Sequence, residues 1–152
     1  MITETQLNAK YGIPNKEGKG YIIQITLPYP MYYDGKKVTK ISCHKLVADK
    51  LLAIFNDILD FYGIDAIQDL KIDDYGGCFN YRLMRGGTKL SVHSWGCAID
   101  LNRSRNLLNE TSKTARFARI EYKPMIDIFY KHGFESLGRE KNYDWMHFQV
   151  KD

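Results

Sequence analysis

Residues 91–101, Ser-Val-His-Ser-Trp-Gly-Cys-Ala-Ile-Asp-Leu, form the most informative stretch of this chain. The first six residues are typical of a turn, and the last five, Cys97–Leu101, predict a short strand. Side chains alternate between the two faces of a strand, so Ala98 and Asp100 share one face. We therefore expect Asp100 to face a site beside the small Ala98, and Cys97 to point into the core.

A second segment, Asp144-Trp-Met-His-Phe148, lies near the C-terminal end. A catalytic zinc ion takes about three protein ligands from the His, Asp, Glu and Cys set and leaves a position for water. The two segments together offer His93, Asp100 and His147, which we predict bind one Zn²⁺ per chain. Zinc lowers the pKa of a bound water to roughly 7, and hydrolysis also needs a carboxylate that accepts the proton of that water. Asp144 is the candidate catalytic carboxylate.

The first part of the chain predicts a β-hairpin. Residues 21–27 (YIIQITL) are rich in β-branched and aromatic types and predict a strand, which Pro28 and Pro30 are expected to stop. Asp34-Gly35 is a turn signal, and residues 36–41 predict a possible return strand.

Helical spacing of apolar residues is clearest from Val47 to Tyr62, with Ser42 as the expected cap and Gly63 at the C-terminal end. The mixed order of helices and antiparallel-looking strands indicates an α+β fold and not regular βαβ repetition. The other predicted elements are a strand at 78–83, loops at 86–87 and 102–113, a helix from Pro124 to about His132 that Gly133 closes, and a closing strand at 145–150.

The 152 residues suit one domain, 1–152, with an N-terminal helix and strand part (1–70) and a zinc-site part (71–152). The formal charge of +4 gives a mild attraction for anionic partners, such as nucleic acid or a cell-wall polymer, and does not choose between them. The sequence contains no recognisable signal peptide and no apolar run long enough to span a membrane.

The other cysteines and histidines are expected to have structural roles. Cys43, Cys78 and Cys97 form no CxxC pair, so we expect three reduced thiols and synthesis in the cytoplasm. His44 is expected to face solvent near a helix start, and His132 to lie at a helix C-terminus, where its charge suits the dipole.

The order Ser-x-His-x-x-Gly-x-Ala-x-Asp, followed by an acidic residue and Trp-x-His-Phe, resembles the family of D-alanyl-D-alanine carboxypeptidases and L-alanyl-D-glutamate endopeptidases, which includes phage endolysins. The resemblance covers roughly residues 76–150. It implies a zinc enzyme that cuts the peptidoglycan stem peptide, built as a small α+β domain whose antiparallel sheet carries the zinc site. The matching residues are Ser91, His93, Gly96, Ala98, Asp100, Trp145, His147 and Phe148.

The resemblance also implies roles for residues around the metal. Arg82 would polarise the scissile carbonyl or bind a substrate carboxylate. Ser91 is expected to hydrogen-bond near the substrate or to orient its loop. Trp145 is expected to shape the rim of the substrate cleft, with a core position as the alternative. The segment after Arg82 lacks the glutamine-containing helix usual in the family, so Arg85 competes for the same role. Asp144 stands where the family more often has glutamate.

Two classes of function are compatible with these patterns. The first is an endolysin-type peptidoglycan peptidase, phage or bacterial, made in the cytoplasm and acting on the cell wall after release; we favour the L-alanyl-D-glutamate endopeptidase over a D-alanyl-D-alanine carboxypeptidase or dipeptidase. The second is a non-catalytic zinc module that binds wall polymer or nucleic acid. Structural zinc sites usually have four protein ligands, and three are evident here, which favours the enzyme.

For the enzyme we expect the peptidoglycan stem peptide as the partner, with no nucleic acid and no membrane insertion. The oligomeric state is left open.

Overall fold

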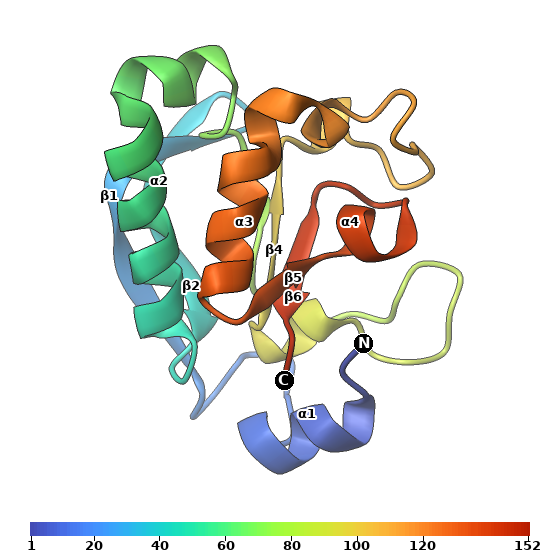
Figure 1. The fold of residues 1–152 in the computed structure, drawn as a ribbon. Helices are drawn as coiled ribbons and strands as arrows, with labels where there is room; N and C mark the ends of the chain where they lie inside the picture. Colours follow the sequence, from blue (N-terminus) through green and yellow to red (C-terminus); the bar gives the residue numbers. More distant parts are fainter.

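Two antiparallel sheets and four α-helices form an α+β fold, as the sequence predicts (Figure 1). The computed structural model describes all 152 residues. One sheet is the hairpin β1-β2, and the other has four strands in the order β3-β4-β6-β5. The elements are α1 (Glu4–Tyr11), β1 (Ile22–Tyr33), β2 (Lys36–His44), α2 (Ala48–Asp69), β3 (Tyr75–Gly77), η1 (Val92–Trp95), β4 (Ala98–Leu101), η2 (Arg103–Arg105), η3 (Arg116–Ala118), η4 (Ile120–Tyr122), α3 (Lys123–Lys131), β5 (Phe134–Ser136), α4 (Leu137–Lys141) and β6 (His147–Val150), where η marks a short 3₁₀ helix.

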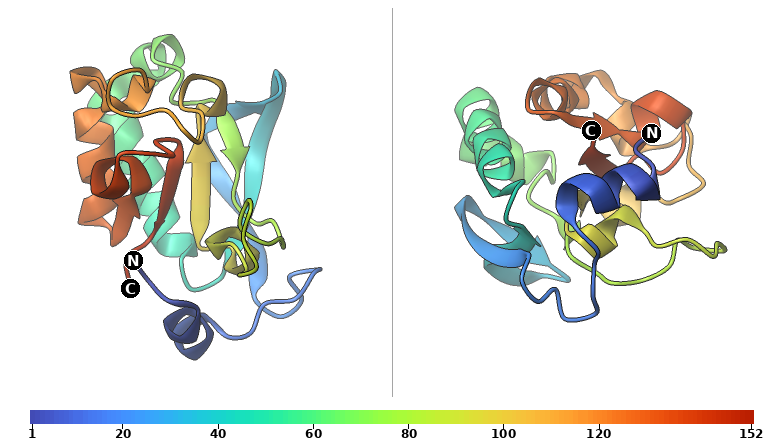
Figure 2. Two further views of the ribbon diagram at one scale, coloured as in Figure 1. Left: turned by 90° about the vertical axis from the view of Figure 1, so that its right-hand side faces the viewer. Right: turned by 90° about the horizontal axis from the view of Figure 1, so that it is seen from below.

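The inner strands of the larger sheet, β4 and β6, occupy the middle of the molecule. Helices α2 and α3 lie together on one side of this sheet (Figure 2). Phe129 of α3 stacks on Phe148 of β6, with ring centroids 4.0 Å apart and both side chains fully buried. Such stacked, buried rings stabilise a core through apolar burial and favourable ring geometry. The aromatic core therefore fixes β6 against the helical layer.

The hairpin differs from the expectation at its prolines. We expected Pro28 and Pro30 to stop the first strand, and that prediction is wrong, because β1 runs on to Tyr33. The β1–β2 register shifts across the stretch that holds both prolines, so their missing N–H groups interrupt no regular ladder there. The Asp34-Gly35 turn is confirmed, since both residues have positive φ (49° and 76°), as a two-residue type I′ hairpin requires.

Helix α2 is confirmed, with different ends. Ser42 does not cap it: Ser42 lies in β2, paired with Gln24, because the return strand extends to His44. The helix begins at Ala48 without a side-chain cap. Gly63 leaves the helical conformation (φ 75°, ψ 162°), as a terminal glycine would, but helical turns resume and continue to Asp69.

Other predicted elements differ in the middle of the chain. The expected strand at 78–83 is wrong, because the residues that pair with β4 are those just before it, in β3. Helix α3 agrees with the prediction from Pro124. Helix α1 was not predicted, although its capping box was readable: Thr3 Oγ accepts from Gln6 N at 3.2 Å, and Gln6 Oε1 accepts from Thr3 N at 2.9 Å. The short β5 and α4 were also missed.

The histidines outside the site have different environments. The prediction that His44 faces solvent is wrong: its side chain is buried, and its Nε2 lies 2.7 Å from the carbonyl oxygen of Tyr11, because α1 folds over the end of the hairpin. His132 does lie at the C-terminal end of α3, with Nε2 2.7 Å from Asp57 Oδ2. The three cysteines are free and buried, as expected, at Cys43, Cys78 and Cys97.

Gly96 is the turn residue that joins η1 to β4. Its φ of +69° lies in the left-handed region, which glycine adopts without steric cost. The Gly96 carbonyl accepts a hydrogen bond from His44 N at 3.0 Å. A Cβ at position 96 would lie 2.8 Å from that same His44 nitrogen and 2.5 Å from Ile22 Cδ1. The turn between His93 and Asp100 is therefore packed directly against the backbone of β2.

Gly96→Ala should destabilise the protein more than Gly86→Ala. Both glycines have φ of +69°, so both variants carry the cost of left-handed alanine, about 1–2 kcal/mol. A Cβ at position 86 would meet nothing within 4 Å, whereas one at position 96 would press on backbone, which should add about 1–3 kcal/mol. Thermal unfolding of the two variants measures the difference. Equal melting temperatures would show that the turn can move away from β2 without cost.

Candidate active site

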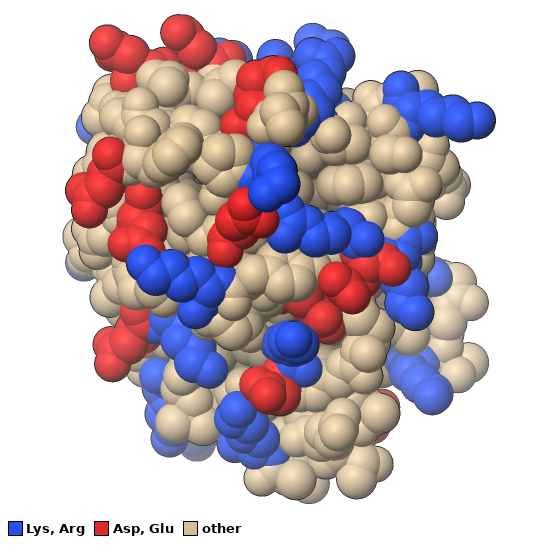
Figure 3. Space-filling model, viewed as in Figure 1, with Lys and Arg blue, Asp and Glu red and all other residues tan.

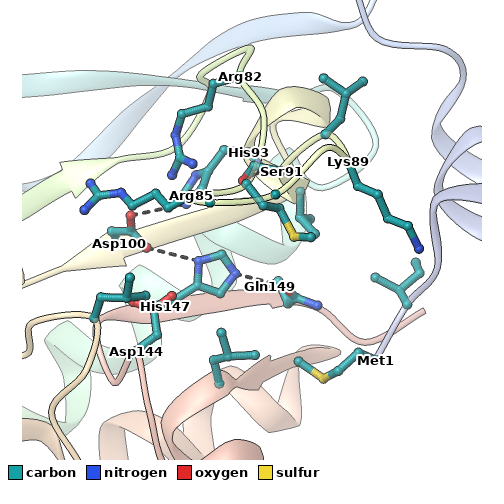
Figure 4. Close-up of a pocket in the computed structure, with 18 of the residues that line it drawn as sticks. Met1, Arg82, Arg85, Lys89, Ser91, His93, Asp100, Asp144, His147 and Gln149 are labelled. Atoms are coloured by element: carbon teal, nitrogen blue, oxygen red, sulfur yellow. Dashed lines mark hydrogen bonds and ion pairs between the residues drawn. The ribbon is translucent and has the colours of Figure 1, made fainter.

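Three side chains converge on one point beside β4 and β6. Asp100 and His147 are direct partners across the antiparallel β4–β6 pair, and His93 comes from η1. His93 Nε2 lies 3.2 Å from Asp100 Oδ2, and His147 Nδ1 lies 3.2 Å from Asp100 Oδ1 (Figure 4). One potential ligand atom from each of the three lies within 4.8 Å of the others, so the group could hold a metal ion.

The outer nitrogen of His93 is held by the backbone. His93 Nδ1 lies 2.7 Å from the carbonyl oxygen of Cys78, and a carbonyl can only accept, so Nδ1 carries the hydrogen. Nε2 then has no hydrogen, and its lone pair points towards Asp100. This nitrogen is buried and makes no hydrogen bond, because the short approach to Asp100 lacks hydrogen-bond geometry. A buried acceptor without a donor, facing a carboxylate, fits a site built for a cation.

The outer nitrogen of His147 is held by a side chain. His147 Nε2 lies 2.8 Å from Gln149 Oε1, so Nε2 donates to the amide oxygen, and in the neutral imidazole the lone pair of Nδ1 then faces Asp100. Burial alone would raise the pKa of Asp100, but His93 and His147, when they carry a proton towards it, hold that pKa well below its usual range. Asp100 is therefore an anion facing two imidazole nitrogens. This donor set of two nitrogens and a carboxylate matches the ligands that zinc prefers.

Asp144 lies in the turn just before β6 and lines the same cavity as the three candidate ligands. Its backbone has φ of 52°, and it is held from both sides: its N–H donates to Leu108 O at 2.9 Å, and its carbonyl accepts from His147 N at 3.0 Å. Burial raises the pKa of Asp144 above its ordinary value, against the opposing effect of His147. Asp144 therefore shares the cleft with the three candidate ligands.

The cavity is a cleft of about 640 Å³ with cationic side chains on one wall. That wall is a hairpin-like segment, residues 82–91, closed by hydrogen bonds from Met84 N to Lys89 O (2.8 Å) and from Ser91 N to Arg82 O (2.9 Å). Arg82, Arg85 and Lys89 all line the cleft. The cleft can therefore attract a substrate that carries carboxylates.

The two candidate arginines occupy different parts of this segment. Arg82 is at its base, where its N–H donates to Ser94 Oγ (3.1 Å) and its carbonyl accepts from the same hydroxyl (3.0 Å). The Arg82 guanidinium donates to Leu83 O at 3.2 Å. Arg85 is exposed near the tip of the segment. Anchoring fixes the position of Arg82 relative to η1, and hence relative to His93.

Ser91 lines the cleft and Trp145 does not. Ser91 is buried, and its Oγ accepts from His93 N at 3.3 Å, so it caps η1 while lining the cleft. Trp145 lies in the core, with its ring against Gly138 and its Nε1 donating to Asn142 Oδ1 at 3.2 Å. Trp145 does not line the cleft. The structure therefore agrees with the alternative for Trp145, a position in the core.

Sequence reasoning missed two features of the site. Gln149 was not singled out, although it follows His147 by two positions on one strand and therefore shares its face. The N-terminal residues Met1 to Glu4 also line the cleft, together with Leu7 of α1. Nothing in the local sequence signals that contact, because α1 reaches the cleft only through the tertiary fold.

Comparison with known proteins supports the interpretation of this site. Residues 85–150 match the family model described as D-alanyl-D-alanine carboxypeptidase. The matched segment includes all three candidate ligands and Asp144, and it begins after Arg82. No curated protein matches the chain significantly. None of the helices has the length and apolar character needed to cross a membrane.

If the cluster binds zinc, His147→Ala should remove the metal. An imidazole nitrogen supplies the ligand atom, and alanine offers none. Elemental analysis should find about one zinc per chain in the unmodified protein and far less in the variant. His132→Ala is the matched control, because His132 pairs with Asp57 away from the cluster. Zinc near one per chain in His147→Ala would exclude His147 as a ligand.

Proposed function

We propose that this chain, whose residues 85–150 match the D-alanyl-D-alanine carboxypeptidase family model, is a member of that family and cleaves the peptidoglycan stem peptide as an endolysin-type L-alanyl-D-glutamate endopeptidase. Members of the family are zinc metallopeptidases that act on peptidoglycan. The observation that carries the proposal is the cluster of His93, Asp100 and His147 in the wall of an open cleft, with Asp144 beside it.

In this proposal the metal ligands are His93 Nε2, the Asp100 carboxylate and His147 Nδ1. Zinc, when bound, supplies Lewis-acid activation of water and of the scissile carbonyl at neutral pH. The donor atoms fit this ion, because both imidazoles turn an unprotonated nitrogen towards the carboxylate. Three protein ligands leave room for water or substrate, as catalytic zinc sites require.

Asp144 has the role of proton carrier. Its carboxylate accepts the proton of the attacking water and delivers it to the nitrogen of the leaving amine, so the amide bond breaks without expelling an amide anion. The support is its position: it lines the cleft and its carbonyl is hydrogen-bonded to the backbone of His147. Aspartate reaches less far than glutamate, but Asp144 lines the cleft all the same.

Arg82 is the proposed partner of the scissile carbonyl or of a substrate carboxylate. Both arginines line the cleft, but the backbone of Arg82 is tied to Ser94 in η1, the element that carries His93. A group that stabilises developing charge is effective when its position is fixed before the reaction. This preorganisation favours Arg82 over the exposed Arg85.

An internal cut in the stem peptide requires room on both sides of the reacting bond. Four residues that line the cleft lie on opposite sides of the cluster in Figure 4: Lys89 and Met1 on one side, and Arg85 and Asp144 on the other. A cleft that extends both ways favours the endopeptidase over the carboxypeptidase that the family description names. Mass spectrometry of digested murein distinguishes the two: release of terminal D-alanine alone would replace the endopeptidase with a carboxypeptidase.

The charges on the face shown in Figure 3 support the enzyme over a nucleic-acid-binding module. Figure 3 shows Lys and Arg interspersed with Asp and Glu on the face it presents, where a nucleic-acid site would need a continuous basic surface. The cationic side chains of the cleft instead lie beside the candidate ligands. Short carboxylate-bearing peptides suit that arrangement better than a long polyanion.

Arg82→Ala should lower murein cleavage on the order of a hundred-fold while zinc remains bound, because Arg82 contacts substrate and not metal. Arg85→Ala is the matched comparison, and its effect should be much smaller. Release of soluble murein peptides gives the rate, and elemental analysis gives the zinc content. A large loss in Arg85→Ala with normal turnover in Arg82→Ala would move the role to Arg85.

Asp144→Asn tests the proton carrier. The amide keeps nearly the shape of the carboxylate but cannot accept the proton, so we expect cleavage to fall by about 10²- to 10⁴-fold. Zinc content and melting temperature should remain close to those of the unmodified protein. Activity within a few-fold of the unmodified protein would assign the proton transfer to another group. Loss of zinc would place Asp144 among the groups that hold the metal.

A further inference from the structure

The second candidate histidine is oriented by a side chain, Gln149, that is itself almost completely enclosed. Gln149 is 5% exposed, lies on β6 two residues after His147, and directs its Oε1 to His147 Nε2 at 2.8 Å. This contact requires the hydrogen on Nε2, so in the neutral imidazole Nδ1, which lies 3.2 Å from Asp100 Oδ1, is the acceptor. The amide therefore decides which nitrogen of His147 faces Asp100.

The two histidines differ in what holds them. His93 donates to a backbone carbonyl, that of Cys78, which no side-chain replacement can remove. His147 donates to the amide of Gln149, which a single substitution does remove. Partners of this kind fix the tautomer and the ring orientation of a metal-binding histidine, and their loss typically weakens metal binding about 10- to 100-fold.

We propose that Gln149 is a positioning residue of the metal site, which presents Nδ1 of His147 to the metal through its amide oxygen. The inference rests on the proposed function only in that a metal is bound there. It concerns a residue that touches neither the metal nor the reacting atoms. Gln149 acts on the site by holding one ring in one tautomer.

The neighbouring strand gives a reason for glutamine at this position. Glu135 of β5 is the direct partner of Gln149 across the β5–β6 pair, so their side chains share a face of the sheet. Glu135 is buried, and its Oε1 has no hydrogen-bond partner. A glutamate at 149 would also accept from His147, but it would place a second carboxylate opposite Glu135. Glutamine supplies the acceptor oxygen without that repulsion.

Gln149→Leu tests the proposal, because leucine fills a similar volume and offers no acceptor. We expect the zinc dissociation constant, measured by competition with a chelator, to rise about 10- to 100-fold. The ring Nε2–H of His147, seen in ¹H–¹⁵N spectra of the zinc-loaded protein, should lose its protection from solvent exchange. Glu135→Gln is the matched control: it changes the residue opposite Gln149 but keeps the amide oxygen, so zinc affinity should stay within about two-fold.

The double variant Glu135→Gln/Gln149→Glu adds a rescue. It restores an acceptor at 149 without two facing carboxylates, and its zinc affinity should return to at least that of the unmodified protein. Zinc affinity within two-fold in folded Gln149→Leu, or an equal loss in the double variant, would overturn the positioning role. If the unmodified protein binds no zinc, the proposed function fails first. If it binds zinc equally with leucine at 149, only the role of Gln149 fails.

Discussion

The antiparallel pairing of β4 with β6 is the contact on which the site depends. It makes Asp100 and His147 direct partners, although 46 residues lie between them in the chain. Side chains alternate along each strand, so a shift of one residue in either strand would turn one of the two to the opposite face of the sheet. The register is held by burial, because Ile99 and Phe148, the next partners, enter the core on the opposite face.

Residues that precede the matched segment 85–150 hold part of the site in place through hydrogen bonds. Three hydrogen bonds tie η1 and its turn to the first 44 residues: Trp95 Nε1 donates to Gly12 O (2.8 Å), Tyr21 Oη donates to Ser94 O (2.9 Å), and His44 N donates to Gly96 O (3.0 Å). These contacts position His93, which has no partner strand of its own. The first 44 residues thus support one candidate ligand, while the central sheet carries the other two.

The electrostatics of the cluster follow from this construction. A buried carboxylate is costly unless cations or donors surround it, and the nearest groups to Asp100 are two imidazole nitrogens whose hydrogens are engaged elsewhere. Two acceptors facing a carboxylate at 3.2 Å repel it unless a cation, either a proton or a metal ion, lies between them. Because the outer nitrogens are held by Cys78 O and Gln149, the cluster of His93, Asp100 and His147 is favourable only when a cation lies among the three side chains.

Sequence patterns predict the α+β class, the Asp34-Gly35 turn, helix α3 and the alternation that turns Asp100 towards the site, because each depends on neighbours within one element. These patterns also indicate which residue types could bind zinc. Four other features follow from the tertiary fold: β1 runs through its prolines, His44 is buried under α1, Trp145 fills the core, and Gln149 holds His147. Those outcomes depend on contacts between segments far apart in the chain, and local propensity carries no information about which segment will cover a given residue.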